Sequence, residues 1–331
     1  MNLYLGLDTS AYTTSLAMVD EADNIILDKR ILLEVKQGER GLRQSDALFL
    51  HMKNLPFLFK DLAPNFTSRI KALAVSAAPR NIPDSYMPVF LAGLAQAEVL
   101  ASFNGLPLYK VSHQEGHLMA ALHGFKNLLI HKAFLAVHFS GGTSELLRVE
   151  RSNNDYFQVD IVAEGNDLHA GQLVDRVGVA MGLPFPAGPS MERIARPGND
   201  REFTIASAVD EWGFSFSGPE AAALRMIQSG KDHGNIAFAV FRSIANTLEK
   251  VLLGCAAKTG IRDILLAGGV MANRLIRERL QQRLEHPSLG IKLYFAEPNL
   301  ASDNAVGVAM LAADLHKGRE MRIDADYADL L

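Results

Sequence analysis

Two short segments with the same design, about 130 residues apart, constrain the fold of this chain more than any other feature. In residues 3–20, LYLGLDTSAYTTSLAMVD is an apolar run, a turn of small polar residues and a second apolar run. Residues 134–150, FLAVHFSGGTSELLRVE, repeat this pattern. Each segment predicts a two-stranded hairpin with Ser, Thr or Gly at its tip. We therefore expect two lobes of related topology with a cleft between them, although a plain tight hairpin also explains either turn alone.

Apolar runs of strand length alternate with longer helical stretches along the chain. The predicted strands are residues 3–7, 14–19, 70–76, 133–140, 157–163, 263–269 and 291–297. The predicted helices are residues 86–104, 113–124, 170–182, 219–229, 235–258, 271–285 and 303–316. Long helices between buried strands indicate an α/β fold whose sheets are covered on both faces.

The composition is that of an ordinary globular protein. Of the 331 residues, 48% are hydrophobic and 21% are charged, and no apolar run reaches the length of a transmembrane helix. The single cysteine, Cys255, excludes an intramolecular disulfide and is expected to be a buried small hydrophobe. Because the first residues also lack the pattern of a signal peptide, we expect a cytoplasmic protein. The net charge of −4 does not favour a free-standing nucleic-acid binder.

A pair of histidines predicts a metal site. His113 and His117 lie in SHQEGHLMAALHGF, which begins with a helix-capping Ser and continues in helix formers. The four-residue spacing places both imidazoles on one helix face, one turn apart. We expect Asp303, in NLASDNAVGVAM, to supply a third ligand, because two His and one carboxylate leave positions open for water or substrate. The alternative is a polar stripe on a surface helix.

Glu115 argues against a metalloprotease. In the zincin motif the Glu directly follows the first His and reaches the metal-bound water. Glu115 comes two residues after His113, about 200° around the helix, so its carboxylate faces away from the metal. No nucleophile–base pair is evident in the sequence, and peptidase activity is therefore not expected.

Three further motifs carry groups suited to a nucleotide. In LLAGGVMANRLIRERL (265–280), Gly-Gly before a helix directs backbone donors toward an anion, and Asn273 lies in the first helical turn. Gly188, in GLPFPAGPSMERIA, lets a ligand pass close to the backbone. Asp175, in the middle of a predicted helix, is placed for a ribose hydroxyl. Simple packing explains the Gly-Gly pair equally well, and surface pairing with a neighbouring arginine explains Asp175.

The order of the motifs resembles one family. The segments are HQEGH, SGGTSEL, GQLVDRVGVAMGLPFPAGP, FSFSGPEAA, LAGGVMANRLIRERL and EPNLASDNA. They are similar to motifs of the TsaD family, bacterial threonylcarbamoyl-transferases once labelled O-sialoglycoprotein endopeptidases, from the first strand to about Met310. The resemblance implies a two-lobed actin/sugar-kinase-like fold around a nucleotide cleft. The implied lobes are residues 1–110, completed by the helix 303–331, and residues 111–302, with the metal-binding helix at the junction.

The resemblance also implies roles for individual residues. The family's metal ligands match His113, His117 and Asp303, which implies one divalent metal ion, with Fe(II) favoured over Zn. Its substrate contacts match Ser140, Gly141, Gly142, Asp175, Gly188 and Asn273. In the family these groups hold threonylcarbamoyl-adenylate, from which the threonylcarbamoyl group is transferred to N6 of adenosine 37 in tRNA. The implied partners are TsaB-like and TsaE-like proteins and tRNA.

Several positions depart from the family's pattern. The turn at residues 8–14 has lost both of the family's acidic residues, residues 76–90 replace its G-P-G-L loop, and residues 168–172 replace its L-D-D-A-A-G-E run. Thr143 stands where the family has a His, and Glu220 replaces a basic residue. Two alternatives therefore stay open: a carbamoyl-type transferase acting on another acceptor (an adenylate again being the bound substrate), and a non-catalytic TsaB-like binding partner.

Overall fold

The computed structural model describes residues 1–10, 12–34, 42–60, 62, 64–130, 133–152, 156–198, 202–210 and 213–328. Ala11, in the first predicted turn, and residues 329–331, at the end of the predicted last helix, lie outside the described residues. The chain divides into two compact units. Unit 1 comprises Met1–Gly124, Ser152–Tyr156 and Ser302–Leu331, and unit 2 comprises Phe125–Arg151 and Phe157–Ala301.

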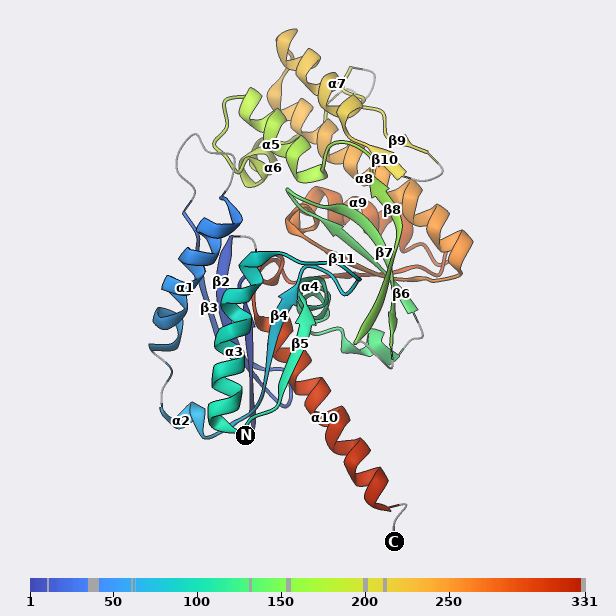
Figure 1. Cartoon of the computed structure of the whole chain (residues 1–331). Coiled ribbons are helices and arrows are strands. Elements are labelled where there is room, and N and C mark those ends of the chain that lie inside the picture. The colour runs from blue at the N-terminus through green and yellow to red at the C-terminus, as the bar shows by residue number, and fades with distance from the viewer. Residues whose placement is uncertain are drawn as a thin grey trace. The chain divides into compact units, whose positions relative to one another are not determined.

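Unit 1 is built on a five-stranded sheet with the order β3-β2-β1-β4-β5 (Figure 1). Its strands are β1 (Leu3–Asp8), β2 (Thr13–Asp20), β3 (Ile25–Leu32), β4 (Ile70–Ala78) and β5 (Leu108–Ser112). The pairs β1–β2 and β2–β3 are antiparallel, whereas β1–β4 and β4–β5 are parallel. Therefore β1, β3, β4 and β5 run in one direction, and their carboxyl ends meet at one edge of the sheet.

Helices cover both faces of this sheet. They are α1 (Gln44–Lys60), α2 (Pro64–Thr67), η1 (Pro88–Phe90), α3 (Leu91–Asn104), α4 (His113–Ala121) and α10 (Val306–Ala328). Leu5 and Leu7 of β1 share a core with residues of α1 and α3. The intervening Gly6 faces α10, as the alternation of side chains along a strand requires.

Close glycine contacts bring α10, from the end of the chain, back to unit 1. A Cβ atom on Gly307 would lie 1.9 Å from the carbonyl oxygen of Gly116 in α4, and one on Gly6 would lie 2.4 Å from the backbone nitrogen of Ala309. Because α4 packs against α10, the helix with His113 and His117 belongs to unit 1. The predicted boundary after residue 110 had placed this helix in the C-terminal lobe.

Unit 2 repeats the strand order of unit 1. Its sheet has the order β12-β11-β6-β7-β8-β10-β9. The strands are β6 (Ala133–Phe139), β7 (Ser144–Arg151), β8 (Phe157–Gly165), β9 (Ala208–Val209), β10 (Gly213–Ser215), β11 (Asp263–Ala267) and β12 (Lys292–Phe295). The β6-β7-β8 meander is antiparallel, and β11 pairs parallel with both β6 and β12. The series β8-β7-β6-β11-β12 thus corresponds to β3-β2-β1-β4-β5, which confirms the related topology predicted from the two hairpins.

The helices of unit 2 enclose its larger core. They are η2 (Lys126–Ile130), α5 (Ala170–Ala180), α6 (Gly188–Ile194), α7 (Ser217–Gln228), α8 (His233–Thr259), η3 (Gly269–Ala272), α9 (Arg274–Leu284) and η4 (Pro298–Leu300). Cys255 packs, half-buried, against this core, and burial raises the pKa of its thiol. Among the described residues, no helix is both long and apolar enough to cross a membrane.

Some elements differ from those predicted. The helix after Gly268-Gly269 begins at Arg274 and not near residue 271, because residues 269–272 form the short η3. The last helix continues to Ala328, well beyond the predicted residue 316. Several elements of unit 1 were not predicted, among them α1, β3 and β5.

Candidate metal centre

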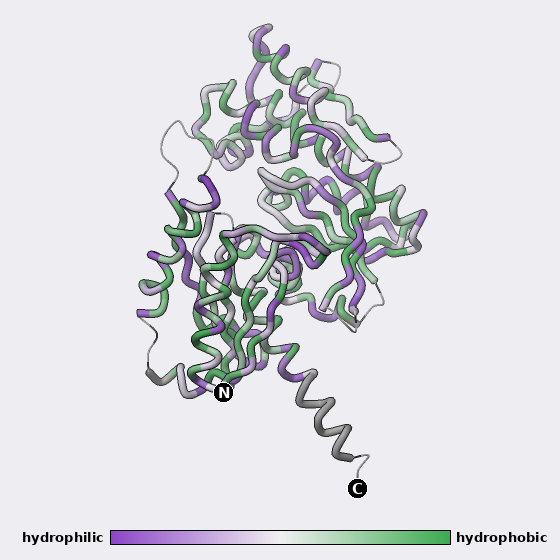
Figure 2. The backbone as a smooth tube through the Cα atoms, viewed as in Figure 1, coloured by the Kyte–Doolittle hydropathy of each residue, from purple (hydrophilic) through white to green (hydrophobic). Residues whose placement is uncertain are grey.

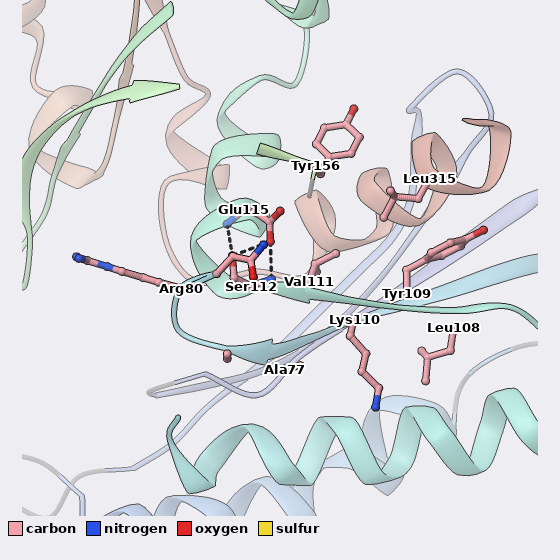
Figure 3. A pocket seen from close by; sticks show the side chains of 12 residues that line it. Ala77, Arg80, Leu108, Tyr109, Lys110, Val111, Ser112, Glu115, Tyr156 and Leu315 are labelled. Atoms are coloured by element: carbon pink, nitrogen blue, oxygen red, sulfur yellow. Dashed lines mark hydrogen bonds between the residues drawn. The ribbon is translucent and has the colours of Figure 1, made fainter. Parts of the chain in front are cut away.

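The first residues of α4 are the candidate ligands themselves. Ser112, the last residue of β5, caps the helix: its Oγ accepts a hydrogen bond from the backbone N–H of Glu115, and the Glu115 carboxylate accepts one in return from the backbone N–H of Ser112 (Figure 3). His113 is the first helical residue, and His117 follows one turn later. Their Nε2 atoms are 2.9 Å apart, so both rings point to the same place, as the spacing predicted.

Asp303 completes a cluster of three possible metal ligands. Its Oδ1 lies 3.2 Å from Nε2 of His117 and 3.6 Å from Nε2 of His113. Two ligand atoms that each lie about 2.1 Å from one cation at right angles to each other are about 3 Å apart. The three spacings therefore fit a single ion, and the donor set of two imidazoles and one carboxylate suits a divalent transition metal.

The loop that carries Asp303 is held on its α10 side. The side-chain amide of Asn304 donates to the carbonyl oxygen of Ser302 at 2.7 Å, and its Oδ1 accepts from the backbone N–H of Val306 at 2.9 Å. The contact of Gly307 with α4 then fixes how far this loop lies from the two histidines.

A second carboxylate, Asp8 at the end of β1, supports the cluster. Asp8 is fully buried, and its Oδ2 lies 2.8 Å from Nδ1 of His113 and accepts from the Ser76 hydroxyl at 2.5 Å. Its Oδ1 accepts from the backbone N–H of Ser10 at 2.9 Å. A carboxylate on the far nitrogen of a ligand histidine fixes both its tautomer and its ring orientation, so Asp8 directs Nε2 of His113 toward the cluster.

This role of Asp8 was not predicted, because the turn at residues 8–14 differs from the family's pattern by the loss of acidic residues. A usable signal was present. Asp8 ends a buried strand and is followed by Thr9 and Ser10, and polar residues at the carboxyl ends of parallel strands commonly form the binding edge of an α/β sheet.

The charges in the cluster shift its pKa values strongly. Burial lowers the pKa of His113, but the charge of Asp8 and the hydrogen bonds with Asp303 and Asp8 outweigh it and raise this pKa to about 10. Burial raises the pKa values of Asp303 and Asp8, yet the nearby histidines hold both below their ordinary value. The metal-free cluster thus favours a protonated His113 between two carboxylates, and a cation can replace that proton.

Glu115 lies on the opposite side of α4 from the histidines, as predicted. Its buried carboxylate accepts from both the backbone N–H and the hydroxyl of Ser112, and it borders a cavity of about 400 Å³ whose lining side chains are drawn in Figure 3. The lining of this cavity does not include the two histidines or Asp303. Glu115 is therefore a capping residue and is not placed to activate a metal-bound water.

In unit 2, the predicted Ser-Gly-Gly contact residues form the tip of the β6–β7 hairpin. The backbone N–H and C=O of Ser140 bond to Thr143 and Gly171 respectively, the latter at the start of α5. No heavy atom lies within 4 Å of the Cβ position of Gly141 or Gly142. The described neighbours therefore leave the backbone of this tip open to a close approach, as a backbone anion contact requires.

The structure places the predicted contact residue Asp175 beside the loop that leads into Gly188, and it makes Asn273 a helix cap. Asp175 of α5 accepts from the backbone N–H of Ala187 at 2.7 Å, which ties it to the loop that leads into Gly188. Asn273 does not lie within the first turn of α9: it is the N-cap, and its Oδ1 accepts from the backbone N–H of Ile276 at 3.0 Å. Its Nδ2 is the group that could contact a ligand.

Comparison with known sequences assigns a family to this arrangement. The profile of the TsaD family, described as tRNA N6-adenosine threonylcarbamoyltransferase, matches residues 51–310. Relatives of that name are 28% identical over 311 residues in Thermotoga neapolitana, covering 92% of this chain and 91% of the relative. The relative in Geobacillus thermodenitrificans is 30% identical over 325 residues, covering 93% of this chain and 89% of the relative. The relative in a strain of Thermus thermophilus is 29% identical over 316 residues, covering 95% of this chain and 93% of the relative.

Solved structures of low sequence identity share the fold. Full-length HypF has a TM-score of 0.59 at 12% identity, covering 95% of this chain and 46% of HypF. Component A of the (R)-2-hydroxyglutaryl-CoA dehydratase of Acidaminococcus fermentans has a TM-score of 0.55 at 15% identity (96% and 100% covered). A ROK family glucokinase from Streptomyces griseus has a TM-score of 0.51 at 13% identity (95% and 100% covered). These likenesses confirm the predicted actin/sugar-kinase fold.

Proposed function

Because the chain belongs to the TsaD family of tRNA N6-adenosine threonylcarbamoyltransferases, we propose that it transfers a threonylcarbamoyl group from threonylcarbamoyl-adenylate to N6 of adenosine 37 in tRNA. The family match over residues 51–310, together with the convergence of His113, His117 and Asp303, carries the proposal. In this acyl transfer the adenosine amine attacks the carbamoyl carbon, the bond from that carbon to the phosphate oxygen breaks, AMP leaves, and the amine loses a proton. Alignment of amine and carbonyl supplies much of the rate.

His113, His117 and Asp303 would hold one divalent cation. Bound there, the cation would supply Lewis acidity toward a carbonyl or phosphate oxygen. We favour Fe(II) over Zn, because two His and one carboxylate with open positions are typical of Fe(II) sites. The chain's own contribution is orientation: Asp8 sets the ring of His113, and the capping box of Ser112 fixes the start of α4.

The polar groups of unit 2 would hold the adenylate. The backbone of Ser140, Gly141 and Gly142 is suited to the anionic part of the substrate, because the glycine positions are open. Asp175 and the Gly188 loop, joined by the hydrogen bond of Asp175 to Ala187, would contact the ribose. Asn273 would donate from Nδ2. Asp175→Ala should therefore raise the KM for the adenylate more than it lowers kcat.

The proposed protein partner would dock on α1 and α3. These neighbouring helices carry hydrophobic residues along their length (Figure 2), and several of them are solvent-exposed. The exposed residues are Phe49, Met52 and Phe57 on α1 and Leu91, Val99 and Phe103 on α3. Phe103 is 88% exposed, and a cluster of large apolar side chains on adjacent helices is typical of a protein–protein interface. We assign this face to a TsaB-like partner, with a TsaE-like protein and tRNA completing a cytoplasmic assembly.

The transfer itself provides the test. Purified protein is combined with Fe(II), threonylcarbamoyl-adenylate, tRNA and the TsaB-like and TsaE-like partners, and N6-threonylcarbamoyladenosine is measured by mass spectrometry after tRNA digestion. His117→Ala and Asp303→Asn should each reduce the product by more than about 100-fold. Asp160→Asn, which removes a half-exposed carboxylate of β8, serves as the control and should leave transfer unchanged.

The same assay separates the alternatives. Consumption of an adenylate without tRNA modification would favour a carbamoyl-type transferase with another acceptor, which the altered segments 76–90 and 168–172 motivate. A wild-type protein that binds neither metal nor adenylate would favour a non-catalytic TsaB-like partner.

A further inference from the structure

Arg30, on the edge strand β3, reaches the loop that carries Asp303. Its Nη1 donates to the hydroxyl of Ser302 at 2.9 Å, and Ser302 immediately precedes Asp303. The other guanidinium nitrogens, Nε and Nη2, donate to the two carboxylate oxygens of Asp28 at 2.9 and 2.5 Å. A bidentate pair of this kind fixes the plane of the guanidinium, so Asp28 directs the remaining nitrogen of Arg30 at Ser302.

Arg30 also lies in the same cross-strand row as Asp8. In the sheet register Asp8 is opposite Ser15, and Ser15 is opposite Arg30. Directly opposed residues on neighbouring strands project to the same face of a sheet, and Asp8 projects to the face of α4, where it meets His113. One row of the sheet therefore contacts both halves of the metal centre: Asp8 contacts His113, and Arg30 contacts the neighbour of Asp303.

We propose that Arg30 is a positioning residue of the metal centre. The bridge from Asp28 through Arg30 to Ser302 holds the loop at residues 301–305 at the distance at which Asp303 shares a cation with the histidines. Without the guanidinium, this loop keeps the hydrogen bonds of Asn304 on the α10 side and the packing of Ala305 on Gly6 of β1, but it loses the hydrogen bond between Ser302 and the edge strand β3. Metal binding must then fix a more mobile Asp303, and the conformational entropy lost in doing so lowers the affinity for the metal. This inference rests on the metal site of the proposed function and not on the identity of the transferred group.

The test compares metal affinity with the stability of the metal-free protein. Arg30→Met, Ser302→Ala and the double variant are titrated with Co²⁺ against a chelator, the d–d absorption of bound Co²⁺ is recorded, and the Tm of each metal-free protein is measured. Arg30→Met should weaken Co²⁺ binding about 10-fold and alter its spectrum. Because both residues act through one hydrogen bond, the double variant should lose no more affinity than Arg30→Met alone.

The matched control is Arg148→Met in unit 2. Arg148 also lies on a strand and pairs with a carboxylate two residues along, Glu150, and with Asp160, so it reports what the loss of such a pair does to Tm. Three results would each overturn the proposal. They are an unchanged Co²⁺ affinity in Arg30→Met, a loss of that affinity in Arg148→Met as large as the loss in Arg30→Met, and a loss in the double variant that equals the sum of the losses in the two single variants. If Arg30→Met does not fold, Ser302→Ala still tests the proposal, because it removes only the hydroxyl that accepts the hydrogen bond from Arg30. A wild-type protein that binds no Co²⁺ would overturn the metal site and this inference together, whereas failed tRNA modification with intact metal binding would affect only the proposed reaction.

Discussion

At His113 a proton and the proposed metal ion would compete for the same nitrogen. Because its folded pKa is raised to about 10, above the ordinary value of 6.5, the proton stabilises the metal-free protein in full below about pH 6.5, and this contribution is lost as the pH rises toward 10. Metal binding depends on pH in the opposite direction and becomes stronger as the pH rises, since the proton on His113 must leave before the metal binds. We expect the Co²⁺ affinity to increase between pH 6.5 and 9, by up to about tenfold per pH unit, in chelator competition. A flat profile would contradict the assignment of His113 as a ligand.

The charge of Asp8 is the largest effect that raises this pKa, ahead of Asp303, so its removal has a separate consequence. Asp8→Asn keeps the shape but removes the carboxylate from Nδ1 of His113. Metal affinity at pH 7 should fall by about 10- to 100-fold, and the pH dependence should level off at a lower pH, because the pKa of His113 is lower. Asp20→Asn, which removes a hydrogen-bonded carboxylate at the last residue of β2, opposite the start of β1, should change neither quantity.

The clustering of the candidate ligands could be predicted from the sequence, whereas the residues that support them could not. His113 and His117 are four residues apart in one helix, so their convergence follows from helical geometry alone. Asp8 and Arg30 act through strand register, which depends on pairings between segments that are distant in the chain. The convergence of Asp303 depends on how α10 packs, so helix geometry could not predict it; Asp303 was expected as a third ligand from donor chemistry and from the family resemblance.

At the scale of single elements, the fit between α10 and α4 depends on a residue without a side chain. Gly307→Ala would place a methyl group 1.9 Å from the carbonyl oxygen of Gly116, so the helices must move apart. We expect the free energy of unfolding to fall by about 2 kcal/mol or more in urea denaturation, and the Co²⁺ affinity to fall with it. Gly318→Ala, in the same helix with no atom near its Cβ position, should instead raise stability by up to about 1 kcal/mol. Equal effects of the two substitutions would show that the contact is unimportant.

The elements that were not predicted share a physical cause. The strand β3 is only half-buried and contains Asp28, Lys29 and Arg30, so it lacks the apolar run by which buried strands are identified. The strand β5 has five residues, and α1 contains Pro56, which normally argues against a helix interior. Tertiary packing on the central strands, which is not visible locally, determines these three elements.

At the scale of the whole molecule, a bound metal should stabilise the fold of unit 1, because its candidate ligands come from two segments of that unit, 1–124 and 302–331, that unit 2 separates in the chain. A ligand at 100 times its Kd adds about 2.7 kcal/mol to the free energy of unfolding. The Tm should therefore rise when Co²⁺ or Fe(II) is added and fall when a chelator removes it, as followed by calorimetry. Asp303→Asn should abolish most of this metal-dependent shift, and a shift that survives in this variant would indicate binding elsewhere.

The exposed face of α1 and α3 makes a prediction about assembly. Phe103→Asp places a charge in the proposed interface and should weaken binding of the TsaB-like partner by at least about 30-fold, the effect of about 2 kcal/mol at an interface hot spot. Co²⁺ affinity should be unchanged. Ile161→Asp, at an exposed apolar residue of β8 in unit 2, is the control, and calorimetric titration of the partner into each variant measures the difference.

The return of α10 to the first unit has a consequence for biosynthesis. The ribosome delivers residues 1–124 early, but Asp303 and the helix that buries Gly6 follow only after the residues of unit 2 have been made. During translation, the first sheet therefore has one face that only α4 covers, and its two histidines lack the third candidate ligand. A metal ion held by all three residues would therefore bind only after residue 303 has been made, and a chain released early by premature termination would leave part of that face open to chaperones and proteases.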